Sequence, residues 1–281
     1  MRCDGVPAGT TVWLLVLHTC RPDSLGGFLN KLRPGSELPE DLQKLYLTRF
    51  TGHEAYRNRI WQVLTSEFFS RWVHNSSTIL DLGCGYGEFI NNVSAGKKYA
   101  MDLNPSTKDR LRDEVEFLEQ DCSLPWPFPD HSLDIVFTSN FFEHLPTKHV
   151  LLATIAEAFR CLKPNGRLIA LGPNIKYLTG TYWDFFDHYL PLTELSVAEL
   201  MSLSGFEIER SIGRFLPYTM SLGYQPAVWK VRLFLKCPFV WRFFGRQFLV
   251  IGQKTGKQQL EELSTSRQID RPPPVKGNEK D

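Results

Sequence analysis

The sequence predicts an α/β fold with a doubly wound, mostly parallel sheet. From residue 78 onward, short apolar runs typical of buried strands alternate with amphipathic segments that have helical spacing. The run 78–82 ends in the glycine loop Gly83-Cys84-Gly85-Tyr86-Gly87, and a helical pattern follows. Asp102 ends the next apolar run, 19 positions after Gly83. In a doubly wound fold, that spacing places a carboxylate near the hydroxyls of a bound ribose.

Composition narrows the class of protein. A chain of 281 residues is long enough for one large domain with appendages. Its net charge of +1 does not favour a nucleic-acid partner, and we expect none. The six cysteines are scattered without a Cys-x-x-Cys pair, which predicts reduced thiols rather than disulfides or a zinc site. We therefore expect a cytoplasmic protein.

Three segments flank the predicted sheet. Residues 1–36 read as an irregular extension, and residues 254–281 read as a disordered tail. Residues 37–77 read as a helical cover, with helical spacing from 37 to 73 that is divided at Gly52. This cover either packs ahead of the sheet or closes over the site with one of its aromatic or basic residues, namely Tyr46, Arg49, Phe50 or Tyr56.

The glycine loop points to a ligand without phosphates. A dinucleotide site requires Gly-x-Gly-x-x-Gly, whereas here the third glycine is Gly87 and Glu88 occupies the reserved place. A carboxylate in the first helical turn would repel a pyrophosphate. The Gly-Lys-Ser/Thr of a phosphate loop is also missing. The loop therefore suits a cationic ligand that can sit beside acidic groups.

The later strands place further polar residues at one sheet edge. We expect strands over 98–102, 115–118, 133–139 and 168–172, with helices over 151–162 and 196–204. Open α/β sheets bind ligands at the carboxyl ends of their strands. The residues that leave this edge are Asn140, Glu143 and His144 after the fourth strand, and Asp184, Asp187 and His188 in the aromatic loop after the fifth.

Several of these motifs together resemble the bacterial class I S-adenosylmethionine (SAM)-dependent methyltransferases of the type 11/type 23 group. They are the acidic-x-Gly-x-Gly-x-Gly run from Asp81, the Asp102-Leu-Asn-Pro sequence, Glu143-His144-Leu145, and the Leu-Lys-Pro turn at 162–164. The resemblance covers about residues 45–253. It implies a Rossmann-like sheet of seven strands, six parallel and the seventh antiparallel, with helices on both faces. It also implies SAM as cofactor and a domain over 78–253.

The resemblance assigns cofactor roles to individual residues. Asp81 would face the ammonium end of SAM, and Asp102 would accept the ribose hydroxyls. Asp121 would bind the adenine amino group, with the backbone of Cys122 beside the ring. The other residues expected at the cofactor are Gly83, Cys84, Gly85 and Gly87 of the loop, Leu103 after the second strand, and Asn140 after the fourth.

Two segments inside the domain depart from the plain fold. The cap loop 176–195 should lie across the pocket. An insert at 215–246 precedes the last strand, which we expect at 247–251, and it interleaves cations with large apolar residues. The insert is either a helical cap packed on the protein or a peripheral membrane contact through 228–246. Phosphates of a sugar nucleotide or lipid diphosphate are a third target for its cations.

Methyl transfer from SAM is an in-line displacement that needs alignment and, for a hydroxyl acceptor, a base. His144 and His188 are the candidate bases, and Glu143, Asp184 and Asp187 could orient them or act themselves. We expect no metal. The expected acceptor is an oxygen of a saccharide or of a lipid-linked or small-molecule substrate. The alternatives are a carboxylate or quinone-precursor methyltransferase and a non-catalytic SAM-binding module.

Overall fold

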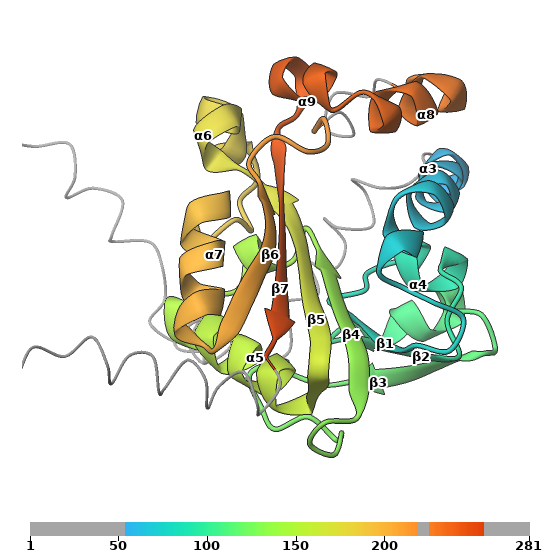
Figure 1. Cartoon of the computed structure of the whole chain (residues 1–281), viewed down its shortest axis with the longest axis vertical. Coiled ribbons are helices and arrows are strands. Elements are labelled where there is room, and N and C mark those ends of the chain that lie inside the picture. The colour runs from blue at the N-terminus through green and yellow to red at the C-terminus, as the bar shows by residue number, and fades with distance from the viewer. Residues whose placement is uncertain (1–53, 219–224, 256–281) are drawn as a thin grey trace, which may run out of the picture. The chain divides into compact units, whose positions relative to one another are not determined.

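A computed structural model describes residues 54–218 and 225–255 of the chain. The extension 1–36, the first part of the helical cover and the tail from 256 onward lie outside these residues, as do Tyr46, Arg49 and Phe50. The described part is one mixed sheet with helices on both faces, as Figure 1 shows.

The sheet has seven strands in the order β3-β2-β1-β4-β5-β7-β6. β7 pairs antiparallel with both β5 and β6, so the other six strands are parallel to one another, as predicted. The chain runs outward from β1 to β3 on one side and from β4 to β5 on the other. The strands are β1 (Thr78–Leu82), β2 (Lys97–Asp102), β3 (Val115–Glu119), β4 (Leu133–Ser139), β5 (Leu162–Pro173), β6 (Phe206–Ile212) and β7 (Gln247–Lys254).

This order creates a switch point between β1 and β4, where an open α/β sheet binds its ligand. In register, Asp81 of β1 lies between Ala100 of β2 and Phe137 of β4. The segments that follow β1 and β4 therefore leave the sheet side by side. The glycine loop and the Asn140–His144 segment come from these two strands.

Each face of the sheet carries its own apolar core. One core includes Leu151 and Ile155 of α5 and Met201 of α7, and the other includes Leu64 of α3 and Phe89 of α4. Figure 1 shows these two pairs of helices on opposite sides of the sheet. The α-helices are α3 (Glu54–Glu67), α4 (Glu88–Asn92), α5 (Lys148–Cys161), α6 (Ile175–Leu178), α7 (Glu194–Leu203), α8 (Val228–Lys236) and α9 (Pro238–Phe244), and short 3₁₀ turns are η1 (Phe69–Arg71), η2 (Pro105–Arg110), η3 (Phe142–His144) and η4 (Thr179–Asp184).

Several predicted boundaries are wrong. The residues expected as a turn at 162–164 belong to β5, which runs over Leu162–Pro173 rather than 168–172. The helical spacing predicted a helix through residue 73, but α3 ends at Glu67 and η1 follows, because Phe68, Phe69 and Trp72 all turn inward and become buried. The predicted tail begins too early, since β7 continues to Lys254. The ammonium of Lys254 donates to the carbonyls of Phe159 and Leu162, so this charged residue is held inside the fold.

An aromatic cluster joins the helical cover to the sheet. Phe137 in the centre of β4 is fully buried and stacks on Phe89 of α4, with ring centroids 3.5 Å apart. Trp61 of α3 and Phe69 of η1 meet the same ring edge-on at 5.9 and 5.2 Å. Burial of large rings is the main source of stabilisation here, and it fixes α3 against the strand next to the glycine loop.

We therefore expect Phe137→Ala to lower the free energy of unfolding by about 3–5 kcal/mol, because it leaves a cavity between α3, α4 and β4. Phe137→Leu should cost less, because it refills part of that space. The matched control is Phe186→Ala, since Phe186 is 80% exposed, and its effect should stay within about 0.5 kcal/mol. Urea unfolding monitored by tryptophan fluorescence measures all three. Equal losses for Phe137→Ala and Phe186→Ala would contradict the role of this cluster.

Candidate active site

The glycine loop is a tight connection held by hydrogen bonds within itself and to β2. The N–H of Gly83 donates to Met101 O at 2.8 Å, and that of Gly87 donates to Cys84 O at 2.9 Å. Gly83, Gly85 and Gly87 have φ of 66°, 53° and 71°, which residues with a Cβ rarely adopt. A Cβ at Gly83 would also lie 2.2 Å from the ring of Phe141. Glycine at this position therefore lets the segment after β4 approach the end of β1.

Asp102 ties this loop to the end of β2. Its Oδ2 accepts the N–H of Gly85 at 2.9 Å, and its Oδ1 accepts the N–H of Asn104 at 2.9 Å. Each carboxylate oxygen has a second acceptor position, so the group can still receive the two ribose hydroxyls predicted for it. Leu103, the next residue, is 51% exposed beside it.

Asp81 is the buried carboxylate of the site. It is 3% exposed, and its pKa is raised well above the usual value by burial, with further increases from Glu88 and Asp102. The backbone of Ile90 partly offsets these effects. Asp102 also has a raised pKa because of its burial. The end of β1 thus concentrates negative charge in a poorly solvated place, which favours a cationic ligand.

Arg57 of α3 is a residue that the sequence reading missed. It is buried and forms an ion pair with Glu88, and its guanidinium lies 5.2 Å from the centre of the Tyr86 ring. Arg110 stacks on the same ring at 3.9 Å. Arg57 compensates the charge of Glu88, so Glu88 is not the residue that would repel a phosphate, as the sequence suggested. Any such repulsion would come from Asp81 and Asp102. No local motif links Arg57 to a residue 31 positions later in the chain.

Tyr56, which the sequence offered as a residue closing over the site, takes another role. Its hydroxyl donates to Pro226 O at 2.9 Å and joins α3 to the insert.

The predicted adenine contacts lie after β3. Asp121 uses Oδ1 to accept both the N–H and the hydroxyl of Ser123 at 2.8 Å, so it shapes the turn as well. Cys122 has its thiol in the core, where Thr154 donates to it at 3.3 Å, and its carbonyl accepts Trp126 Nε1 at 2.9 Å. Burial raises the pKa of Cys122 to about 11, so its thiol is not reactive. The cofactor roles of both residues remain predictions.

Asn140 turns the chain at the end of β4. Its φ is 50°, and its N–H donates to Leu171 O at 2.8 Å. The side-chain Nδ2 donates to Ser139 Oγ at 3.1 Å, whereas Oδ1 is buried without a hydrogen-bond partner in the described part of the chain. An unsatisfied amide oxygen at the ligand-binding edge is consistent with the predicted contact to a bound molecule.

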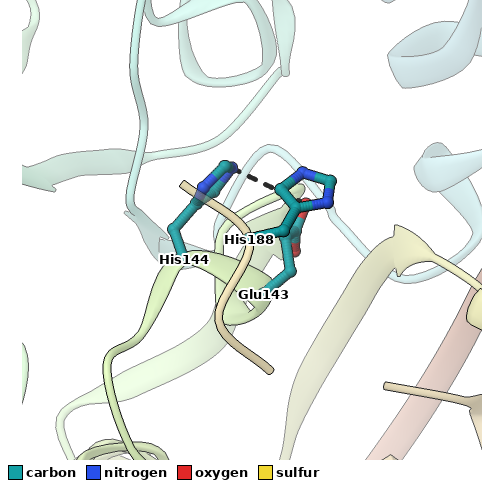
Figure 2. A group of neighbouring side chains, drawn as sticks. All are labelled: Glu143, His144 and His188. Atoms are coloured by element: carbon teal, nitrogen blue, oxygen red, sulfur yellow. Dashed lines mark ion pairs between the residues drawn. The ribbon is translucent and has the colours of Figure 1, made fainter. Parts of the chain in front are cut away.

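Three titratable side chains converge beyond this point. Figure 2 shows Glu143 and His144 from η3 facing His188 from the cap loop. One potential ligand atom from each residue lies within 4.8 Å of those of the other two. His144 Nε2 is 3.9 Å from Glu143 Oε1, and the two imidazole rings meet edge-on with centroids 5.0 Å apart. The sequence reading named these residues separately and did not foresee this cluster.

Asp187 orients His144. The Nδ1 of His144 lies 2.8 Å from the Asp187 carbonyl and 3.4 Å from its Oδ2. Both partners accept hydrogen bonds, so Nδ1 carries the proton and the Nε2 lone pair is available. Glu143 is 1% exposed, and burial raises its pKa to about 7 although His144 lowers it. Asp184 is exposed, so of the two predicted aspartates it is Asp187 that contacts His144.

The cap loop is anchored beside the cluster. The N–H groups of Tyr189 and Leu190 both donate to Glu143 O, at 2.8 and 3.1 Å. The hydroxyl of the fully buried Tyr182 donates to Leu190 O, and the Tyr182 ring lies 4.6 Å from that of His188. His188 is itself 6% exposed. These contacts hold His188 next to η3 although 44 residues separate it from His144.

Part of the chain is similar to known proteins. Residues 80–170 match the family described as "Methyltransferase domain". The ubiquinone/menaquinone biosynthesis C-methyltransferase UbiE of Salmonella arizonae is 30% identical over 158 residues, which is 50% of this chain and 61% of that protein. The same enzyme of Salmonella paratyphi B is 29% identical over 151 residues, 48% of this chain and 58% of that protein. The chain thus spans about three-fifths of the length of these relatives.

A solved structure shares the fold. The SAM-dependent methyltransferase of Archaeoglobus fulgidus superposes with a TM-score of 0.55 at 18% identity, over 73% of this chain and 99% of that one. This likeness confirms the predicted fold class. The family match, over residues 80–170, is to a methyltransferase domain and agrees with the predicted methyltransferase and its cofactor SAM.

The burial of Asp81 leads us to predict how the stability of the protein changes with pH. Its folded-state pKa is raised, so its contribution to stability is present below the unfolded-state pKa of about 3.9 and is lost as pH rises through the folded-state pKa. Asp81→Asn removes the buried charge. We expect it to raise the free energy of unfolding at pH 8 by on the order of 1 kcal/mol, or roughly 2–4 °C in Tm.

The gain should shrink as the pH falls from 8 to 5. Asp113→Asn, at an exposed position, is the matched control and should change Tm little at either pH. Thermal unfolding of the ligand-free protein measures the difference. A Tm for Asp81→Asn that falls below the parent, or a gain that grows toward pH 5, would contradict this electrostatic account.

Proposed function

We propose that this chain, whose residues 80–170 match a methyltransferase domain, is a class I SAM-dependent methyltransferase that transfers a methyl group from SAM to an oxygen of an acceptor. The acceptor class that we propose is a saccharide or a lipid-linked small molecule. We propose oxygen as the methylated atom because Glu143, His144 and His188 cluster beyond the glycine loop, where one of them could act as a base.

The cofactor end of the site suits SAM electrostatically. SAM carries an ammonium and a sulfonium, and Asp81 and Asp102 supply the opposite charge from a buried position. Placing a cation beside these groups would favour their ionised forms and recover part of the cost of burying them. The hydroxyls of the ribose would use the remaining acceptor positions of Asp102.

The cluster suits a hydroxyl acceptor because a hydroxyl must lose its proton. In the proposed step, the acceptor oxygen forms a bond to the methyl carbon while the carbon–sulfur bond breaks. The electron pair leaves with sulfur, and the products are the methyl ether and S-adenosylhomocysteine. The hydroxyl proton passes to a base, for which His144 Nε2 is placed by the contact of Nδ1 with Asp187.

A second candidate is methylation of a carbon atom in a quinone precursor. The relatives in Salmonella are named as C-methyltransferases of ubiquinone and menaquinone biosynthesis. The match covers only part of both chains and does not decide the acceptor.

Binding of SAM tests the cofactor half of the proposal. Titration calorimetry should detect one SAM per chain, and Asp102→Asn should weaken binding by about 10–100-fold, because a hydrogen-bonded carboxylate contributes about 1.5–3 kcal/mol. Asp113→Asn should bind like the parent. Failure of the parent to bind SAM would overturn the proposal.

The form of the transferred methyl group tests the acceptor half. Extracts are incubated with the protein and SAM labelled in the methyl group, and the labelled pool is treated chemically. A methyl ether withstands mild alkali and releases methyl iodide in hydriodic acid, whereas a methyl ester is lost in alkali and a C-methyl group withstands both. Label in ether form, lowered by about 100-fold or more in His144→Ala, is the expected result. Label that survives both treatments would favour the quinone-precursor alternative.

We also propose that the insert holds the protein at an anionic membrane surface. Residues 215–246 contain five lysines and arginines and no acidic residue. One side of the insert packs inward through Phe215, Leu235 and Trp241, so part of it is a helical cap. The other side exposes Trp229, Phe239, Phe243 and Phe244, each more than half accessible.

The position of the insert fits this role. In Figure 1, α8 and α9 lie at the end of the sheet where β5 finishes and α6 begins. Two arginines, Arg214 and Arg242, line a groove of about 880 Å³ at this end, with Tyr177 and Phe239. In the described residues no helix is long and apolar enough to cross a bilayer. Contact would therefore use interfacial aromatic rings and cations.

Vesicle sedimentation tests this contact. We expect binding to phosphatidylcholine vesicles only when they contain phosphatidylglycerol, with affinity falling as salt rises. The double variant Lys236→Gln/Arg242→Gln should bind about 30-fold more weakly, at about 1 kcal/mol per cation. Leu203→Ser, at an 80% exposed apolar position on α7, is the control and should bind normally. Equal binding to both vesicle types would contradict the proposal.

A further inference from the structure

From the convergence of Glu143, His144 and His188, we infer a site for a divalent transition-metal ion that binds the acceptor oxygen. The inference rests on the proposed function and specifies how the acceptor is activated. Two imidazoles and one carboxylate are a recurrent ligand set for zinc, manganese, iron and cobalt. Three protein ligands leave coordination positions for a substrate oxygen.

The carboxylate of Glu143 is the strongest indication. It is 1% exposed, and neither of its oxygens has a hydrogen-bond partner among the described residues. His144 Nε2 lies 3.9 Å from Glu143 Oε1, which is too long for a hydrogen bond. Buried carboxylates are normally paired or bound to a metal, because burying one without compensation is costly. An ion between these side chains would supply the missing compensation.

The two histidines are arranged as metal ligands usually are. His144 directs Nδ1 toward the Asp187 carbonyl at 2.8 Å, with the Asp187 carboxylate at 3.4 Å. A hydrogen bond of this kind fixes the ring and raises the basicity of the opposite nitrogen. His188 is 6% exposed and is held between Tyr182 and Phe185, with ring centroids at 4.6 and 5.0 Å. Both rings are therefore positioned before any ion binds.

The spacing is compatible with coordination. Ligand atoms about 2.1 Å from a tetrahedral ion lie about 3.4 Å apart. His144 Nε2 and Glu143 Oε1 are 3.9 Å apart, and the full set lies within 4.8 Å. Binding an ion therefore requires the ligand atoms to move together by up to about 1.4 Å, through rotation about side-chain torsions.

The ion would change how the hydroxyl is activated. The lone pair of His144 Nε2 would then hold the ion rather than act as the base, and the ion would lower the pKa of the bound hydroxyl. The hydroxyl proton would leave to solvent, the oxygen would bond to the methyl carbon, and the carbon–sulfur bond would break with its electron pair on sulfur. This predicts acceptors with a hydroxyl able to coordinate a metal, and it replaces the earlier expectation that no metal is used.

Titration of Co²⁺ into the untagged, chelator-treated full chain tests the site without an acceptor. We expect one Co²⁺ per chain with visible absorption typical of nitrogen and oxygen ligands, displaced by Zn²⁺. Glu143→Gln and His188→Gln should each weaken Co²⁺ binding by at least about 10–100-fold, the loss typical of even outer-sphere partners. His149→Ala, an exposed histidine on α5, is the matched control and should bind Co²⁺ as the parent does.

Two further measurements separate the possible failures. Thermal unfolding with and without Co²⁺ shows whether each variant is folded, because a ligand bound only by the native state raises Tm. SAM titration of the same samples reports the cofactor site independently. No Co²⁺ uptake by a parent that binds SAM would overturn the metal site and leave the methyltransferase proposal standing. Undiminished Co²⁺ uptake by both Glu143→Gln and His188→Gln would show that the ion binds elsewhere, and this would also overturn the metal site. Co²⁺ uptake by a parent that does not bind SAM would contradict only the proposed function.

Discussion

The carboxylate of Asp102 is the interaction on which the geometry of the cofactor end depends. It accepts backbone N–H groups from Gly85 and Asn104, and so joins the glycine loop after β1 to the turn after β2. The positive φ angles of the loop glycines make this connection short enough. Because the loop is tight at Gly83, Phe141 can pack directly against it. This contact fixes the position of the cluster of Glu143, His144 and His188 relative to the glycine loop, because Glu143 follows two residues after Phe141.

Charge at the site is balanced from outside the sheet. Glu88 begins α4 and is partly buried, and its compensating cation is Arg57 from the helical cover. The aromatic rings of Trp61, Phe69, Phe89 and Phe137 hold that cover in place. The apolar core on this face therefore serves the electrostatics of the site as well as the stability of the fold. Within residues 54–77 of the cover, Asp81 forms no such ion pair, so a cationic ligand could supply the compensating charge.

The fold was largely predictable, because its elements have strong local signals. The strands at 78–82 and 133–139 are continuous apolar runs, and the structure places them at those residues. The end of β7 was not predictable, since Lys254 is buried by contacts with carbonyls about 90 residues away. Arg57 and the cluster were missed for the same reason. Glu143 and His144 meet His188 only because β4 and β5 are neighbours, and that proximity has no signature in residue spacing.

The anchoring of the cap loop has a consequence for how such proteins diversify. The loop leaves β5 at Pro173 and returns to Glu143, whose carbonyl receives the N–H groups of Tyr189 and Leu190. These two anchors are backbone contacts, and Tyr182 adds a side-chain hydrogen bond to Leu190 O. Residues such as Trp183 and Phe186, which are 55% and 80% exposed, can be exchanged without disturbing the attachment. Changing the exposed residues of this loop, with its anchors kept, is therefore a route to new acceptor preferences on an unchanged donor-binding scaffold.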